Sequence, residues 1–370
     1  MNKVITILSF GYPNSLSPTL FTFVENIVIQ WRNMGYYVRV INPVPLRKQK
    51  NNQIIGKHKD DVFPPYKDYL WMRKFPGLKR LQIFLMYKSV YQSILKFYDL
   101  KSDYIFSYFL NSGFIASRLS KKFNVKSFCH FGESTLWSLN DRSLHSCIRD
   151  LEHIRGYVSV SRKNTQLLID EKITDSKKII TIPNAVDLNM FYKHDKIIVR
   201  EKLGIPLNLT VGIFVGHFIE RKGPLRVEQA TINIPNFKMI YIGSGNQEPQ
   251  GGNIIFKGRV KHEELSEYLS AADFFILPTL AEGCCNAIIE AMACGLPIIS
   301  SKMSFNDDIL DEEISILVDP KNILELSIAI KTLIEDIDLR NKMSVLAEKK
   351  AKKFDIKIRA KKIIDYMENN

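Results

Sequence analysis

The chain has 370 residues, with 52 Lys and Arg against 39 Asp and Glu, and a formal net charge of +13. Its composition, 45% hydrophobic and 25% charged, is that of an ordinary globular protein and argues against a disordered chain, a collagen and a disulfide scaffold. The excess of positive charge is compatible with nucleic acid, an anionic membrane surface or small phosphorylated ligands, and composition does not choose among them.

Length and cysteine usage indicate the number of domains and the compartment. At roughly 150 residues per domain, the length predicts two domains. No apolar run reaches about 18 residues, which argues against a polytopic membrane protein. The five cysteines form no Cys-x-x-Cys pair, so they indicate neither a zinc ribbon nor a thioredoxin-type site. A reducing cytoplasm fits them best.

The chain begins with a strand–helix–strand pattern. Residues 4–8 are rich in β-branched side chains, are too short a run for a signal peptide, and predict a buried parallel strand. A helical period follows over about 19–34 and ends at Gly35, and residues 37–41 predict the next strand. From 43 to 76, five prolines punctuate a polar, basic segment, which we interpret as an insertion or functional loop.

Helices and strands then alternate to the end of the chain. Before residue 190 we expect helices near 78–97, 111–122 and 162–171, and strands at 103–107, 126–130, 156–160 and 178–182. The alternation restarts with strands at 211–215, 238–242, 254–257, 273–277 and 297–300, a helix opening at Gly223-Pro224, and a mostly helical tail from 321. This order predicts an α/β protein of two doubly wound units, whose ligands bind beyond the carboxyl ends of the strands and often between domains.

The segment 280–297 carries the densest set of candidate site residues. Glu282 lies in the loop after a predicted strand, and Glu290 lies about one turn inside a helix that begins near Asn286 and ends at Gly295. Both carboxylates can face a ligand over the helix N-terminus, where free N–H groups suit a phosphate or sugar hydroxyls. The alternative is that Glu290 pairs with a buried backbone group or an arginine, and that Glu282 is solvated.

The segment 215–223 also follows a strand and precedes a helix. Gly216, His217, Arg221 and Lys222 there make a diphosphate clamp plausible, with Lys as a point charge and Arg as a fork. The alternative is a solvated basic loop.

Three further features follow strands. His130 ends a strand of the first half, either as a ligand contact or as a structural histidine. Gly243-Ser244-Gly245 is a weak dinucleotide signal, because Glu248 stands where a third glycine is needed. Residues 182–187 indicate a structural turn into the interdomain linker.

These segments, in this order, resemble the retaining glycosyltransferases of family 4, which have the GT-B fold. The run E-G-x-x-N-x-x-x-E-A-M-A-C-G-x-P spans 282–297, and G-R-x-x-x-x-K-G matches at Gly216, Lys222 and Gly223, with His217 in place of the arginine. The linker motif I-P-N-G-V-D is present at 182–187 with Ala185 for its glycine. Further matches lie at 271–273, at 258–260 and at His130.

The resemblance implies an architecture and an activity. Two Rossmann-like domains would face an interdomain cleft: an acceptor-binding domain at 1–188 and a nucleotide-sugar-binding domain at 189–353, with a helix at 354–370 returning to the first. The reaction would move a sugar, with retention, from a nucleotide-diphosphate sugar to a glycan or polyprenyl-linked acceptor, in cell-surface polysaccharide synthesis. Neither a cofactor nor a metal would be required.

The resemblance also implies roles for individual residues. His130, Glu282 and Lys222 would be catalytic. The donor would be bound by Gly216, His217, Arg221, Lys222, Gly258, Glu282, Gly283, Cys284, Asn286 and Glu290. Gly11 lies in the first-domain loop, where the family usually has paired glycines, and residues 304–308 replace the family's Gly-Gly-x-x-Glu loop.

Two alternatives on the same fold are a nucleotide-sugar epimerase and a non-catalytic GT-B binding subunit. No nucleic-acid motif supports a nucleic-acid partner. Between Tyr66 and Lys88, cationic residues alternate with aromatic residues. They could lie on an anionic membrane, which would make a cytoplasmic protein peripheral to the inner face of the plasma membrane. The alternative is that the aromatics are core and the cations solvated.

Overall fold

The computed structural model describes residues 3–49, 54–96, 102–139 and 142–370. It divides into two compact units. Unit 1 consists of Met1–Ile182 with Ala360–Asn370, and unit 2 of Pro183–Arg359. The sequence placed the corresponding boundaries at 188/189 and 353/354.

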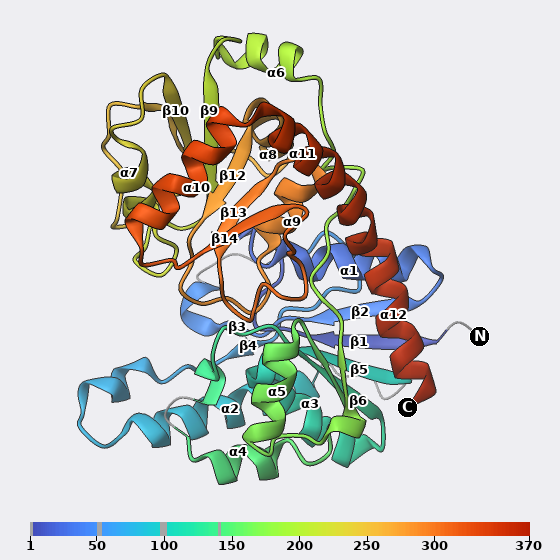
Figure 1. Cartoon of the computed structure of the whole chain (residues 1–370). Coiled ribbons are helices and arrows are strands. Elements are labelled where there is room, and N and C mark those ends of the chain that lie inside the picture. Colours follow the sequence, from blue (N-terminus) through green and yellow to red (C-terminus); the bar gives the residue numbers. More distant parts are fainter. Residues whose placement is uncertain (1–2, 50–53, 97–101, 140–141) are drawn as a thin grey trace. The chain divides into compact units, whose positions relative to one another are not determined.

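Unit 1 contains a six-stranded parallel sheet in the order β2-β1-β5-β6-β7-β8 (Figure 1). Its strands are β1 (Val4–Leu8), β2 (Tyr37–Ile41), β5 (Tyr104–Tyr108), β6 (Lys126–Phe131), β7 (Gly156–Ser159) and β8 (Ile179–Thr181). The helices of this unit are α1 (Thr22–Asn33), α2 (Lys79–Leu95), α3 (Phe109–Phe123), α4 (Leu144–Asp150) and α5 (Arg162–Asp170). The strand order reverses between β1 and β5, which makes their carboxyl ends a topological switch point.

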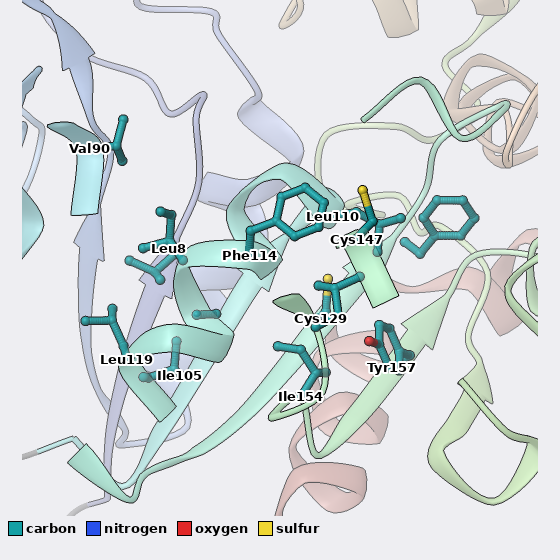
Figure 2. Packing of buried hydrophobic residues seen from close by; sticks show 14 of the residues in the cluster. Leu8, Val90, Ile105, Leu110, Phe114, Leu119, Cys129, Cys147, Ile154 and Tyr157 are labelled. Carbon is teal, nitrogen blue, oxygen red and sulfur yellow. The ribbon is translucent and has the colours of Figure 1, made fainter. Parts of the chain in front are cut away.

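A cluster of buried hydrophobic residues packs between this sheet and α3. Figure 2 shows Leu110 and Phe114 of α3 with Cys129 of β6 and Tyr157 of β7, all almost fully buried. Parallel strands covered by helices on both faces have to be apolar on both, which explains the nearly continuous hydrophobic runs of these strands.

The final helix, α12 (Ile356–Asn369), packs on unit 1. Trp31 Nε1 of α1 donates to the carbonyl of Ala360 at 3.0 Å, and Lys3 Nζ lies 2.9 Å from Glu368 Oε1. A side chain at Gly156 would meet the Tyr366 hydroxyl, so the glycine allows the helix to approach β7 closely. The end of the chain, from Ala360 to Asn370, therefore belongs to unit 1.

Unit 2 contains a second six-stranded parallel sheet, in the order β11-β10-β9-β12-β13-β14. Its strands are β9 (Thr210–Val215), β10 (Phe237–Ile242), β11 (Ile254–Gly258), β12 (Phe274–Leu277), β13 (Ile298–Ser301) and β14 (Ser315–Val318). The helices of this unit are α6 (Lys196–Leu203), α7 (Pro224–Thr231), α8 (Leu265–Ala271), α9 (Asn286–Ala293), α10 (Ile323–Glu335) and α11 (Ile337–Ala351). Counted along the unit, the order is that of a Rossmann sheet, and it reverses between β9 and β12.

The predicted doubly wound α/β fold is confirmed, with a few differences in its elements. Helix α1 begins at Thr22 rather than near 19, because Phe21 has a left-handed backbone with φ 52°. Helices α4 and α6 and strand β14 were not predicted. The ends of α6 carried a signal, since Asp195 accepts from two N–H groups of its first turn and Gly204 ends it with φ 67°.

The described part of the segment 43–76 contains a short pair of parallel strands, β3 (Val44–Pro45) and β4 (Pro65–Tyr66), and two 3-10 helices, Leu46–Lys48 and Leu70–Lys74. Residues 50–53 of this segment, and residue 97 at the expected end of the helix near 78–97, lie outside the described residues. Among the described residues, no helix has the length and apolar character needed to cross a membrane.

Candidate functional site

The predicted donor-binding residues gather at the switch point of the unit 2 sheet. Strands β9 and β12 are direct neighbours, with Phe274 opposite Gly212 and Phe275 opposite Ile213. The loop after β9 runs from Gly216 to Gly223 and leads into α7, and the loop after β12 leads into α9. Because both strands are parallel, the two loops emerge at the same edge of the sheet.

A cluster of three charges joins these two loops. Glu282 Oε1 lies 2.6 Å from Lys222 Nζ and 2.9 Å from Arg221 Nη1, and it accepts a hydrogen bond from Thr279 Oγ1 at 2.8 Å. The side chains of Lys222 and Glu282 are each only 12% exposed. Two cations therefore share one carboxylate, which leaves the cluster with one net positive charge.

Lys222 keeps its proton in this setting. Burial lowers the pKa of Lys222, but the nearby Cys285 thiol and the Glu282 carboxylate together outweigh it, so that the pKa lies above its ordinary value. The Cys285 sulfur is 4.0 Å from Lys222 Nζ. The buried ammonium group of Lys222, which lies where the loops after β9 and β12 meet, is a point charge suited to a phosphate group.

Glu290 has a partner that the sequence did not predict. Its Oε1 lies 3.4 Å from Nε2 of His262, which follows β11, and the ring of Phe191 packs at 5.1 Å from the His262 ring. The hydrogen bond to Glu290 raises the pKa of His262. His262 lies four residues after Gly258, in the loop after a predicted strand. This position is the sequence feature that could have indicated His262 as a site residue.

The alternative for the acidic pair, a solvated Glu282 and a Glu290 paired with a backbone group or an arginine, is wrong for both side chains. Glu282 is 9% exposed and paired with two cations rather than solvated, and Glu290 pairs with a histidine rather than with an arginine. The two carboxylates nevertheless belong to one edge of the sheet, since α9 follows the Glu282 loop directly.

Two helices begin at this edge without a side-chain cap. The N-cap residues, Gly223 for α7 and Cys285 for α9, make no capping hydrogen bond through a side chain. Asn286 Oδ1, at the first position of α9, is buried and has no hydrogen-bond partner among the described residues. Uncapped N–H groups and an unpaired buried oxygen are the features of a site built to receive polar ligand groups.

The linker motif supports the loop before α9. Asn184 Nδ2 donates to the carbonyl of Cys284 at 3.0 Å, which fixes the backbone between Gly283 and Asn286. The buried Cys284 thiol has its pKa raised to about 12 by desolvation, so it stays protonated and acts as a packing residue. The turn at 182–187 therefore has a structural role, as predicted: through Asn184 it holds the loop before α9 in place.

Glycines bring the strand ends of β9, β10 and β11 close together. A Cβ at Gly243 would lie 1.9 Å from the carbonyl oxygen of Gly216, and Gly243 donates to the carbonyl of Gly258 at 2.8 Å. His217 next to Gly216 is exposed and outside the Lys222–Glu282 cluster. Arg221, rather than His217, reaches Glu282.

In unit 1, His130 lies at the corresponding edge of its own sheet. It is 3% exposed on β6, opposite Tyr108 of β5, and its ring lies 4.9 Å from that of Tyr108 and 5.9 Å from that of Phe109. A Cβ at Gly132 would approach His130 Cε1 to 2.8 Å, so the glycine makes room for the ring.

Gly11 and Glu133 determine the paths of the loops at this edge of the unit 1 sheet. Gly11 follows β1, and a side chain there would collide with the ring of Phe21. Glu133 accepts from the N–H of Ser138 at 3.1 Å and of Leu110 at 3.4 Å, which ties the loop after His130 to the start of α3. Burial raises the pKa of Glu133 to about 7. Glu133 was not among the predicted site residues, because only the fold buries it.

The described residues contain no group of three or more His, Cys, Asp or Glu side chains that could hold a metal ion.

Comparison with known proteins identifies the second unit. The sequence model of the family "Glycosyl transferases group 1" matches residues 195–350, which include the loops after β9 and β12. The chain is 25% identical over 350 residues to the Bacillus subtilis (strain 168) protein named "Putative teichuronic acid biosynthesis glycosyltransferase TuaC", covering 89% of this chain and 88% of that protein. It is 28% identical over 142 residues to the D-inositol 3-phosphate glycosyltransferase of Mycobacterium tuberculosis (strain F11), covering 34% of this chain and 30% of that protein.

Solved structures show the same fold. Sucrose-phosphate synthase from Thermosynechococcus elongatus matches with a TM-score of 0.78 and 18% identity, over 100% of this chain and 99% of that one. Anabaena Alr3699/HepE in complex with UDP matches with a TM-score of 0.76 and 16% identity, over 100% of both chains. Residues 195–350 are thus a glycosyltransferase group 1 domain, in a chain whose two Rossmann-like units have the GT-B fold.

Proposed function

We propose that this protein transfers a sugar, with retention of the anomeric configuration, from a nucleoside-diphosphate sugar to a hydroxyl group of a glycan or lipid-linked acceptor. The observation that carries the proposal is the Lys222–Glu282–Arg221 cluster at the switch point of unit 2, between two uncapped helix N-termini. Such an edge favours a bound diphosphate.

The charges of this cluster suit the departure of a nucleoside diphosphate. Lys222 supplies a buried point charge and Arg221 a guanidinium fork, and Glu282 fixes both before the substrate arrives. Preorganised charges that face the developing negative charge of a leaving group need no rearrangement at the moment of reaction. In this proposal these cations neutralise the diphosphate, so the reaction requires no metal ion.

Glu290 is the proposed acceptor for the ribose hydroxyls of the nucleotide. A carboxylate only accepts hydrogen bonds, and His262 orients the Glu290 carboxylate through Oε1. The backbone N–H groups near Gly283 and Asn286 would assist at the donor sugar. His130 is proposed to contact the transferred sugar or the acceptor, from its place at the carboxyl end of β6.

The relatives support a role in cell-surface polysaccharide synthesis. The Bacillus subtilis relative is named for teichuronic acid biosynthesis, and one structural neighbour is in complex with UDP-glucose. We extend both properties to this chain as a proposal, with a uridine nucleotide as the first donor to test.

An exposed aromatic and basic surface in unit 1 supports the proposal of a lipid-linked acceptor. Of the aromatic residues between 66 and 88, Trp71 is 61% exposed, Phe75 53% and Phe84 58%, whereas Tyr66 is buried. Lys74 and Lys79 are exposed beside them. We propose that this exposed surface (Trp71, Phe75, Phe84, Lys74 and Lys79) holds a cytoplasmic protein on the inner face of the plasma membrane.

The test is transfer from a panel of nucleotide sugars, in buffer containing EDTA, to acceptors extracted as lipid-linked glycans. Release of nucleoside diphosphate that depends on the acceptor, with a product of unchanged anomeric configuration by NMR, supports the proposal. Binding of the donor without any release or transfer across the panel contradicts it. That outcome favours the second candidate, a non-catalytic binding subunit, to which the exposed His217 in place of the family arginine points.

A further inference from the structure

Unit 1 contains a pocket that the proposed donor chemistry does not use. It lies between α2, α3 and the segment 142–150, and it has a volume of about 300 Å³, within the range of small-molecule sites. The three helices α2, α3 and α4 lie together on one side of the unit 1 sheet in Figure 1. The pocket lining includes one carboxylate, that of Asp150, and four guanidinium groups, those of Arg80, Arg118, Arg142 and Arg149.

The positive charge of this arginine pocket is only partly compensated. Asp150 Oδ2 accepts from Arg142 Nη2 and lies 3.6 Å from Arg118 Nη2, so one carboxylate serves two guanidinium groups. Arg80 and Arg149 have no carboxylate partner in the part of the chain that the structure describes. Clustered cations in a concave site raise the local concentration of anions.

An aromatic wall holds one of these guanidinium groups in place. Arg142 Cζ lies 4.2 Å from the ring centroid of Phe114 and 5.6 Å from that of Tyr87, within the range of a cation–π contact. Its side chain is 16% exposed. A guanidinium group fixed between a carboxylate and aromatic rings is preorganised for the two-pronged contact that arginine makes with phosphate.

The apolar wall of the pocket continues toward the carboxyl end of β1. The Tyr87 ring lies 5.7 Å from that of Phe114 and 6.3 Å from that of Phe10, which follows β1. Phe84 adds an exposed ring to the pocket lining. The ligand that fits both the arginines and this wall is an anionic group attached to an apolar chain.

We propose that the arginine pocket binds the phosphate or diphosphate group of an amphiphile. Its physiological role rests on the proposed function: the diphosphate of a lipid-linked acceptor would be held here while its sugar extends along Phe10 toward the edge of the sheet. An anionic phospholipid has the same chemistry, and the choice of probes separates the two sources.

The experiment is calorimetric titration of the full chain with farnesyl diphosphate, dihexanoyl phosphatidylglycerol, farnesol and inorganic diphosphate, each in excess UDP. We expect farnesyl diphosphate to bind at least about tenfold more tightly than farnesol or inorganic diphosphate. Of these three, only farnesyl diphosphate contacts both the arginine side chains and the apolar wall. Tighter binding of phosphatidylglycerol also supports the pocket and identifies a phospholipid as its source of phosphate.

Variants of the unpaired arginines test the location. Replacing both residues (Arg80→Gln with Arg149→Gln) should weaken lipid-phosphate binding at least about tenfold, and Arg149→Lys should weaken it less. Lys126→Gln removes one exposed charge of unit 1 outside the pocket and should change the affinity by less than about twofold. Equal binding by the wild type and the double variant overturns the proposal, as does the absence of any lipid-phosphate binding.

The same samples separate this inference from the proposed function. UDP binding and sugar transfer report on unit 2, and an unchanged far-UV spectrum and thermal denaturation curve show that the double variant, whose substitutions lie in unit 1, is folded. If transfer is absent but lipid-phosphate binding depends on Arg80 and Arg149, the proposed function fails and the pocket stands. If transfer occurs but the binding does not depend on these arginines, the pocket fails alone.

Discussion

Lys222 and Glu282 form an ion pair of 2.6 Å between two loops that the chain separates by two helices and three strands. The pair exists because β9 and β12 are neighbours at the point where the order of the sheet reverses. It joins a buried ammonium and a carboxylate at the edge where an open α/β sheet binds its ligand.

Loss of Lys222 should impair transfer more than folding. Lys222→Ala removes the buried point charge proposed to neutralise the diphosphate, while Arg221 still pairs with Glu282. We expect a fall in the transfer rate of at least about tenfold with an unchanged far-UV spectrum. Lys238→Ala, at the opposite end of the sheet on β10, is the matched control and should retain activity. Normal turnover by the Lys222 variant would contradict the assignment.

Glu290 should matter chiefly for the nucleotide. Glu290→Gln keeps the shape of the side chain but weakens the acceptor proposed for the ribose hydroxyls, so we expect UDP affinity and transfer to fall at least about tenfold. Calorimetry with UDP measures the first and a coupled release assay the second. Glu312→Gln changes an exposed carboxylate of the same unit and serves as the control. Wild-type affinity in the Glu290 variant would remove Glu290 from the site.

The His262–Glu290 contact should make the stability of unit 2 depend on pH. The hydrogen bond to Glu290 raises the pKa of folded His262 above its ordinary value of 6.5. The contribution to stability is then fully present below that value and disappears as the pH rises through the raised pKa. Denaturation of the wild type and of His262→Asn between about pH 5.5 and 8.5 should show the largest difference at the acid end.

The control for this pH experiment is His145→Asn, which changes an exposed histidine of unit 1. A stability difference between the wild type and the His262 variant that stays constant over the whole pH range would show that His262 acts only through packing against Phe191.

Alanine substitutions at Gly243 and Gly252 should differ in their effect on stability, because only Gly243 lies in close contact with a neighbouring backbone. Gly243→Ala would place a Cβ 1.9 Å from the carbonyl oxygen of Gly216 at φ +150°, and we expect a loss of at least about 2 kcal/mol in the free energy of unfolding. Gly252→Ala meets nothing within 4 Å and should stay within about 0.5 kcal/mol of the wild type. Similar denaturation midpoints for the two variants would show that the strand ends can separate without cost.

The exposed aromatic residues before α2 should govern membrane binding. Replacing Trp71 and Phe75 together by Ser removes two exposed rings, and we expect binding to phosphatidylglycerol vesicles to fall at least about fivefold in a sedimentation assay. Leu324→Ser removes a side chain that is 70% exposed on α10 of the other unit and should leave vesicle binding unchanged. Equal losses in both variants would indicate a non-specific hydrophobic contribution.

Local patterns in the sequence were sufficient for much of this architecture. Apolar, β-branched runs mark the strands because a parallel sheet buries both faces, and the segment 280–297 shows strand, turn and helix in the order that the structure contains. The spacing of Glu282 and Glu290 likewise depends only on a loop and the first turns of α9. Elements without strong periodicity or length, such as α4 and β14, were missed.

Only the tertiary structure decided which residues meet. The pairing of Lys222 with Glu282, and of His262 with Glu290, depends on strand order, and neighbours in a parallel sheet are not neighbours along the chain. The arginine pocket likewise draws Arg80, Arg118 and Arg149 from three helices that no local pattern connects. The sequence by itself determined the elements and the chemical groups at their ends, whereas the long-range packing of those elements determined which groups act together.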